Sequence, residues 1–332
     1  MNIKTKIIII ILSLLSIASL VFLYVKINKE EIKTEVSPAK PSIPKNFQGE
    51  IKYKVNIQKK DFDFPEELPL IELINEKIGI AKIKEIAKNI GFAGEPDVTQ
   101  DVFDGETYIW KDDKSILFCF PESGLIRFSS ENNLQTDNIS LTDEEIFSIS
   151  ENFFYNNSFV EKGSFKINKI KYLKSDSITE KLLEVEREEA EIFEVIFNPI
   201  FSDYEINTYW TDQPLISVKL LKNGYIFSAQ YTNLTQAQNT QSKYKIKNYD
   251  EFKETIGEST LISVKNVNLA LSDLDKKSIE EIEINNVNLI YLQDSTSSDY
   301  LQPVFKLEGI TSITGYGSEI GTVLYLPAIS RN

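Results

Sequence analysis

The feature that most constrains this chain is a long, uncharged apolar run near its N-terminus. Residues 7–25 read IIIIILSLLSIASLVFLYV, with Lys6 before the run and Lys26 after it. These nineteen residues would rise about 28 Å in an α-helix, close to the hydrocarbon thickness of a bilayer, about 30 Å. We therefore expect a transmembrane helix over 7–25, preceded by a cytoplasmic tail of residues 1–6.

A cleaved signal peptide is the alternative interpretation of the same run. The apolar core of a signal peptide is shorter, about 7–15 residues, and ends at small residues. Ser16, Ile17 and Ala18 meet the second requirement, but apolar residues continue over 20–24. We therefore favour a retained single-pass anchor. Its representative residues are Ile7, Ile11, Leu15, Leu20 and Val25.

The lysines at both ends of the run give little charge bias for orientation. A very short N-terminal tail most easily stays in the cytoplasm, which would place the rest of the chain outside it. The abundance of Ile, Lys and Asn is typical of an AT-rich bacterial genome. The predicted localisation is the bacterial cytoplasmic membrane, with an extracytoplasmic C-terminal region and the lipid bilayer as the anchor's partner.

Length and charge exclude several classes of protein. A chain of 332 residues predicts about two or three domains. Its 42% hydrophobic residues can build a core, which excludes wholesale disorder. The net charge of −14 argues against a nucleic-acid partner, because phosphate binding requires clustered Lys and Arg.

The chain contains no histidine and a single cysteine, Cys119. Without histidine there is no Ser-His-Asp or Cys-His catalysis and no His-ligated zinc. Cys119 lies in the apolar run 116–120, where a small buried thiol is the expected state. We therefore predict a protein that is not an enzyme and that uses no metal and no cofactor.

Residues 26–50 are predicted to form a tether. Pro38, Pro41 and Pro44 disfavour a helix and favour an extended, fairly stiff spacer. Three units are predicted after the tether, over 51–135, 136–243 and 244–332.

Two of these units contain similar sequence patterns. Apolar residues recur at helical spacing over 80–90, and Gly91 is a helix stop signal. A second helix is predicted from residue 140, where Ser140 and Asp143 resemble a capping box. In both units a tryptophan precedes a turn glycine by fourteen residues, Trp110 before Gly124 and Trp210 before Gly224. This spacing predicts a repeated unit; a chance resemblance of two hairpins is the alternative.

The last unit is predicted to begin with a short helix over 250–257, followed by strands within 264–271, 282–291 and 304–307. Taken together, these patterns predict an α+β fold: an N-terminal transmembrane helix, then repeated units of a helix packed on an antiparallel sheet.

Four short motifs carry a family resemblance. They are QPLISV at 213–218, GYI at 224–226, YKIK at 244–247 and YLQPVFKL at 300–307. In this order the chain resembles the bacterial YycH/YycI regulatory proteins over roughly 140–310, with a weaker PepSY-like echo over 80–130. The resemblance implies a single-span extracytoplasmic protein that modulates a sensor histidine kinase and is not an enzyme. The chain departs from the family pattern at 289–291, where a Tyr-Tyr-type strand is expected, and in an acidic insert over 184–194.

Aromatic and strand residues provide the candidate partner-binding positions. Pro303 opens a strand, which is typical of a sheet edge, and a sheet edge can accept an added peptide strand. Trp110, Trp210, Tyr209 and Tyr225 could line a peptide or glycan groove, although aromatic residues on sheet faces usually belong to the core. Trp210 and Tyr225 are retained as candidates. The full set is Tyr300, Leu301, Gln302, Pro303, Val304, Trp210 and Tyr225.

Two other patterns are interpreted as structural. The glutamates at 184, 186, 188, 189, 191 and 194 are expected to form a solvated charged face, because a glycosidase-type pair needs two carboxylates across a cleft. The glycine-rich segment 315–321 precedes a strand, so it does not have the strand-to-helix context of a dinucleotide-binding loop.

The resulting functional hypothesis is a non-catalytic, membrane-anchored, extracytoplasmic regulatory or binding module that modulates a sensor kinase or another membrane protein. The alternative is an architectural envelope protein that acts as a spacer or a self-associating scaffold. A hydrolase with an acidic pair is a third hypothesis.

Overall fold

The computed structural model describes residues 43, 47, 49–73, 77–101, 105–131, 141–176, 181–209, 214–233, 237–265, 271–274, 278–293 and 300–330. The predicted transmembrane helix over 7–25 and most of the predicted tether lie outside these residues. Within them, no helix is both long enough and apolar enough to cross a membrane. Residues 40–332 form one compact unit.

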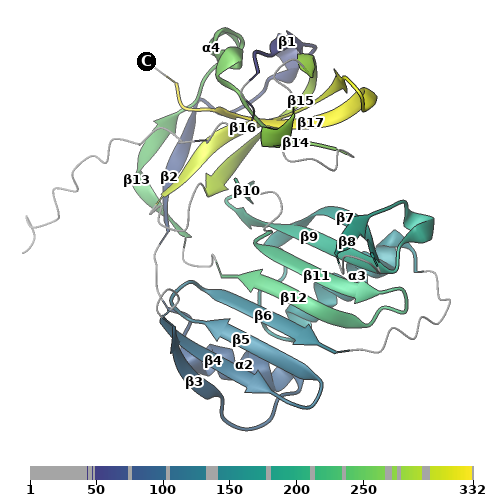
Figure 1. Ribbon diagram of the computed structural model, residues 1–332. Coiled ribbons are helices and arrows are strands. Elements are labelled where there is room, and N and C mark those ends of the chain that lie inside the picture. The colour runs from purple at the N-terminus through teal and green to yellow at the C-terminus, as the bar shows by residue number, and fades with distance from the viewer. Residues whose placement is uncertain are drawn as a thin grey trace, which may run out of the picture. The chain divides into compact units, whose positions relative to one another are not determined.

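The described chain is mostly β-structure (Figure 1). Its α-helices are α2 (Ile80–Ile90), α3 (Asp143–Asn156) and α4 (Tyr249–Thr255). The strands up to the second helix and just beyond it are β1 (Lys52–Val55), β2 (Glu67–Leu73), β3 (Asp97–Asp101), β4 (Gly105–Lys111), β5 (Ser115–Phe120), β6 (Leu125–Ser130), β7 (Phe165–Ser175), β8 (Leu182–Glu184) and β9 (Ile192–Phe201). The remaining strands are β10 (Tyr204–Thr208), β11 (Ile216–Leu221), β12 (Ile226–Thr232), β13 (Ala237–Lys245), β14 (Thr260–Val264), β15 (Ile279–Gln293), β16 (Tyr300–Ile313) and β17 (Gly317–Pro327).

The predicted fold class is therefore wrong. Over the described residues, the structure is not a series of helix-on-sheet repeats and has no helix that could cross a membrane, because the described helices are short and the segments between them fold as long strands. The longest helix, α3, has 14 residues, whereas β15 alone has 15 and β16 has 14. Alternating β-branched and aromatic residues favour this outcome.

The large sheet runs in the order β3-β4-β5-β6-β12-β11-β9-β7-β8, with antiparallel neighbours throughout. Its centre is the pairing of β6 with β12, which joins strands about a hundred residues apart in the chain (Ile126 with Tyr231). The prediction of separate repeated units is wrong at this point, because the two halves share one continuous sheet. Without this pairing, β6 and β12 would each be an unpaired edge strand; together they satisfy each other's backbone hydrogen-bonding groups.

Helices α2 and α3 lie on the same side of the large sheet (Figure 1). Phe128 of β6 contacts Phe92, just after α2, and Phe153 of α3, with ring centroids 6.4 and 5.9 Å apart. Phe154 of α3 packs edge-on against Phe197 of β9. One face of the sheet thus packs on α2 and α3. The opposite face is exposed at Arg127 and Lys169, and it holds a small buried cluster of Leu173, Ile192 and Leu221.

A second set of strands contains both early and late parts of the chain. The order β1-β15-β16-β17-β14 forms one sheet, in which β1 is parallel to β15. Strand β2 pairs with β13 and with the start of β16. Strand β10 connects the two sets, because it pairs with β9 at Tyr204 and with β15 at Ile206. The sequence patterns did not indicate that residues 52–73 pair with the C-terminal strands.

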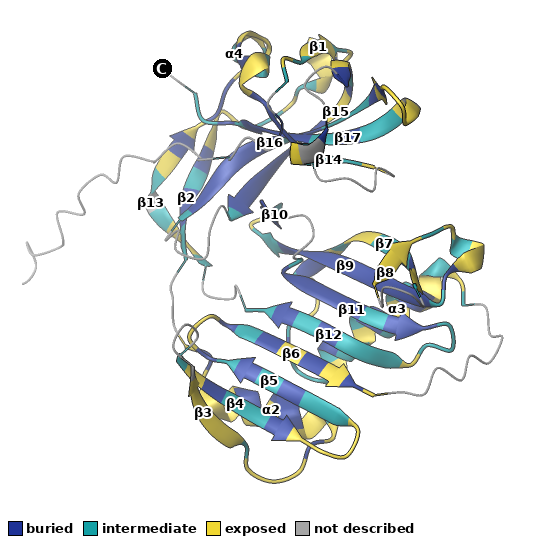
Figure 2. Ribbon diagram, in the orientation of Figure 1, coloured by how far each residue is buried: buried dark blue, intermediate teal, exposed yellow. Residues whose placement is uncertain are grey.

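The burial of each strand depends on its place in the large sheet (Figure 2). Strand β9 is buried along most of its length, whereas the edge strand β3 is exposed at Asp97, Val98, Thr99 and Gln100. An aromatic cluster packs α4 onto the C-terminal strands, with Phe252 edge-on to Phe305 at 5.6 Å.

The local helix signals were more accurate than the fold class. Helix α2 ends at Gly91, which adopts φ 115°, so that prediction is confirmed. Helix α3 begins later than predicted: Thr142 is the N-cap and forms a capping box with Glu145, so the Ser140–Asp143 capping box is wrong. The predicted helix at 250–257 consists of α4 followed by a 3-10 turn at Ile256–Glu258.

The described end of the predicted tether is packed. Phe47 is only 7% exposed and belongs to the main core, and Ile43 packs on a smaller cluster that includes Tyr209 and Val304. The predicted boundaries at 51, 136 and 244 stay predictions.

Candidate functional site

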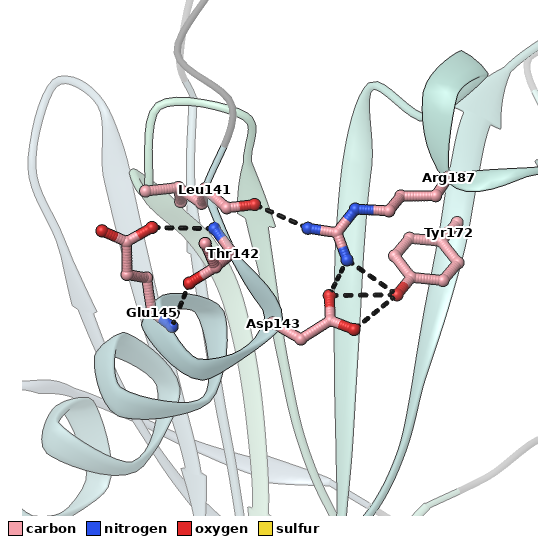
Figure 3. Close-up of polar contacts among 6 residues, drawn as sticks. All are labelled: Leu141, Thr142, Asp143, Glu145, Tyr172 and Arg187. Atoms are coloured by element: carbon pink, nitrogen blue, oxygen red, sulfur yellow. Dashed lines mark hydrogen bonds and ion pairs between the residues drawn. The ribbon is translucent and has the colours of Figure 1, made fainter.

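The polar contacts around the start of α3 form the most connected charged cluster in the described chain (Figure 3). The capping box fixes the first turn of α3, which places Asp143 as the first helical residue. Arg187 comes from a 3-10 turn at Arg187–Glu189, between β8 and β9, and Tyr172 comes from β7. We call Asp143, Tyr172 and Arg187 the Asp143 cluster.

The Asp143 cluster is held by several directed contacts. Arg187 Nη1 donates to Asp143 Oδ1, and its Nη2 donates to the Leu141 carbonyl at 2.7 Å. The Tyr172 hydroxyl donates to both carboxylate oxygens of Asp143, at 3.1 and 3.2 Å. The guanidinium also lies 5.6 Å from the centre of the Tyr172 ring. One arginine therefore joins the loop before β9 to the N-terminus of α3.

The electrostatics of the cluster favour a structural role. Burial, and then the hydrogen bond to Asp143, raise the pKa of Tyr172 above its ordinary value. Burial lowers the pKa of Arg187, but the hydrogen bond and the charge of Asp143 outweigh it, and the pKa is raised overall. Both groups stay protonated at neutral pH, and the carboxylate is already neutralised by its partner. The cluster consequently has neither a free base nor an activated nucleophile.

The cluster also explains how the acidic insert is held. Glu184, Glu186, Glu188 and Glu189 are exposed, in agreement with the predicted solvated face. Glu194 differs, because it lies within β9 and its side chain is 11% exposed between Lys171 and Lys219. Sequence reasoning missed Arg187, although a single cation inside an acidic run is a recognisable signal for an ion-pair anchor.

The structure places residues 300–304 in the interior of the fold. Tyr300 and Leu301 pair with β2, Gln302 and Pro303 pair with β15, and Val304 pairs with both β15 and β17. Leu301 and Val304 are fully buried. The edge-strand interpretation of Pro303 is therefore wrong: its strand has neighbours on both sides, although proline is rare in such positions. The contact of these residues with a partner stays a prediction.

The structure describes one of the two aromatic candidates, Tyr225. Tyr225 lies in the turn between β11 and β12, is 39% exposed, and its hydroxyl is 2.7 Å from Ser130 Oγ. Trp210 lies outside the described residues, as do the anchor residues Ile7, Ile11, Leu15, Leu20 and Val25.

The described residues offer little for catalysis or metal binding. Cys119 is fully buried, and burial raises the pKa of its thiol to about 12, so the reactive thiolate is not formed at neutral pH. Over the described ranges, no group of three or more Cys, Asp or Glu side chains could hold a metal ion.

Comparisons with known proteins give distant structural likenesses. An uncharacterised protein from Eubacterium rectale ATCC 33656 has 12% sequence identity and a TM-score of 0.48, over 86% of this chain and 90% of its own. The Bacillus megaterium YpeB C-terminal domain has 10% identity and a TM-score of 0.37, over 75% of this chain and 99% of its own. No protein-family profile and no curated protein matches the chain.

The second likeness does not single out YycH/YycI proteins, so the predicted family resemblance stays a prediction. Both TM-scores are below 0.5, so neither likeness supports an argument about function.

Proposed function

We propose that this protein is a non-catalytic binding module, held at the bacterial cytoplasmic membrane by residues 7–25 and exposed outside the cytoplasm. The observation that carries the proposal is the large sheet. Helices α2 and α3 cover one face, and on the opposite face strands β4, β5, β6 and β12 present exposed and half-buried side chains, whereas Glu194 and Ile196 of β9 are buried there. Antiparallel sheets often leave one face to solvent, so the face provides the surface, and the apolar run provides the location.

The charged groups of the Asp143 cluster support the non-catalytic part of the proposal. Asp143 and Arg187 neutralise each other, and Tyr172 donates to the same carboxylate. Cys119 is buried. These groups stabilise the fold instead of presenting a reactive centre.

A membrane-protein partner, such as a sensor histidine kinase, is the finer form of the proposal. It comes from the YycH/YycI resemblance of the motifs at 213–218 and 300–307. The test is in-cell crosslinking of the full-length protein in its own membranes, followed by mass spectrometry of the captured proteins. One enriched membrane protein, lost when 7–25 is replaced by an unrelated anchor, is the expected result.

The alternative function is an architectural, self-associating envelope protein. It is favoured by the adjacent leucines Leu182 and Leu183, which are 38% and 47% exposed on the edge strand β8. A hydrophobic strand edge is a surface on which a second copy can pair. Recovery of self-crosslinks alone would support this alternative and contradict the binding module.

A further inference from the structure

The face of the large sheet opposite α2 and α3 carries an organised set of cations, between which Glu194, Ile196 and Ser217 are buried. Directly paired residues of neighbouring strands lie on the same face of a sheet, so the strand register defines rows across it. One row reads Lys171, Glu194, Lys219, Ser228, Ser129, Ile116 and Lys111, from β7 to β4. The neighbouring row reads Lys169, Ile196, Ser217, Gln230, Arg127, Phe118 and Ile109.

These rows lie opposite the helices. Phe128 and Ala229, which alternate with Arg127 and Gln230 along their strands, are buried on the core side. Since successive strand residues point to opposite faces, Arg127 and Gln230 point away from α2 and α3. We call Lys111, Arg127, Lys169, Lys171 and Lys219 the basic face.

Charge on this face is reversed relative to the whole protein, whose net charge is −14. The two rows hold five cations and one carboxylate, Glu194, which lies 3.8 Å from Lys171 Nζ and 3.5 Å from Lys219 Nζ. Arg127 donates to the neutral Gln230 at 3.3 Å. Within the part of the chain that the structure describes, no second carboxylate lies within 4.0 Å of these five cations.

The cations also have a regular spacing. They lie on β7, β11, β6 and β4, which are every second strand of the sheet. Neighbouring strands are about 4.8 Å apart, so successive cationic strands are roughly 10 Å apart and the set spans about 29 Å. At the β4–β5 end, Ile109, Ile116 and Phe118 are half-buried and add an apolar contact surface.

We propose that the basic face binds an acidic polypeptide segment of a partner protein. Residues seven apart on an α-helix are separated by about 10.5 Å along its axis, so carboxylates at that interval match the cationic strands. An apolar side chain near one end would contact Ile109 and Phe118. Those contacts favour a polypeptide over a purely anionic polymer, which offers no apolar groups. The proposal rests on the proposed binding function and adds the chemistry of the partner.

The first test is a titration of the full-length protein in detergent with a labelled synthetic helix of about 25 residues. The helix carries glutamate at seven-residue intervals and leucine near one end. The variant Lys111→Gln/Arg127→Gln/Lys169→Gln removes three exposed cations of the basic face and leaves the Glu194 pairs intact. The control Lys60→Gln/Lys88→Gln/Lys162→Gln removes three exposed lysines elsewhere and changes the net charge equally.

The expected result in fluorescence anisotropy is an affinity about tenfold weaker for the basic-face variant and less than about twofold weaker for the control. The expected loss also shrinks as salt rises, because exposed charges are screened. Equal losses in both variants would overturn the proposal, since only net charge would then matter. Tighter binding to polyphosphate than to the peptide would overturn it in favour of an anionic polymer.

In-cell crosslinking separates this proposal from the proposed function. If the wild-type protein captures a partner and the basic-face variant captures it equally well, the proposed role of the basic face is wrong and the proposed binding function stands. If the wild-type protein captures only itself, the binding function fails. Loss of the partner in the basic-face variant, with retention in the control, supports both.

Discussion

Arg187 shows how a single residue can fix the position of a loop. It is the cation of an acidic insert, and its side chain contacts the carboxylate, the carbonyl and the aromatic ring that surround the start of α3. The pair with Asp143 is partly exposed, 34% and 40% for the two side chains, so water screens part of its energy.

A double-mutant cycle with Asp143→Asn and Arg187→Gln should therefore give a coupling energy of about 0.5–1 kcal/mol. The measurement is urea unfolding of the detergent-solubilised protein. The matched control is the more exposed pair of Lys84 with Glu95, which should give a smaller coupling. Equal coupling energies would show that the extra contacts of Arg187 add nothing.

Glu251 provides a pH-dependent contribution at the same scale. It accepts hydrogen bonds from Ser330 Oγ at 2.7 Å and from the Asn248 N–H at 3.2 Å. The hydrogen bond from Ser330, first, lowers the pKa of Glu251 below its ordinary 4.5. A carboxyl group with a lowered folded-state pKa stabilises the fold above its unfolded-state pKa, and this contribution is lost as the pH falls through the folded-state value.

The variant Glu251→Gln should accordingly be less stable than the wild type by about 1 kcal/mol at pH 7. The difference should narrow as the pH falls through the folded-state pKa of Glu251, which lies below 4.5. Thermal unfolding over a series of pH values from 7 downward measures it. A gap that stays constant with pH would mean that the charge of Glu251 is not involved.

Among the elements, β15 and β16 form the longest pairing, and it contains a close backbone approach. Gly309 of β16 lies opposite Ile284, next to an irregularity in the β15 register. A Cβ atom at Gly309 would collide with the carbonyl oxygen of Glu283, which belongs to the backbone and cannot rotate away.

Gly309→Ala should therefore destabilise the protein by about 2 kcal/mol or more, because the two strands must move apart. Gly257→Ala is the control: nothing lies within 4 Å of its Cβ position. Hydrogen exchange should show loss of protection along β15 and β16 for Gly309→Ala alone. Unchanged protection in that variant would contradict the close approach.

The elements also show what the sequence could and could not predict. The position of α2, the stop at Gly91 and the strand character of 115–120 follow from local spacing, and the structure has them. The fold class did not follow, because the pairing of β6 with β12 depends on contacts about a hundred residues apart. The basic face was missed for the same reason: Arg127 and Lys219 come to lie on one face of one sheet only through that pairing.

At the scale of the molecule, the C-terminal strands require the N-terminal ones. Strand β1 pairs with β15 at 281–284, and β2 supplies Leu68, Leu70 and Ile71 to the core. A fragment containing only 244–332 should thus be largely unfolded by circular dichroism. The same fragment joined to 49–73 through a flexible linker should recover part of its strand signal. A well-folded 244–332 fragment would contradict this dependence.

The same dependence has a consequence for the timing of synthesis. Ile71 pairs with Asn239 of β13 and with Leu301 of β16, so β2 meets its first described strand partner only after a further 168 residues (239 minus 71) have been made. At about 5–20 residues per second, that interval is roughly 10–30 s. An early strand left single for so long can be captured by a chaperone or by another nascent chain. Faster or slower translation of the last hundred residues should therefore change the yield of folded protein more than an equal change in the translation rate near the N-terminus.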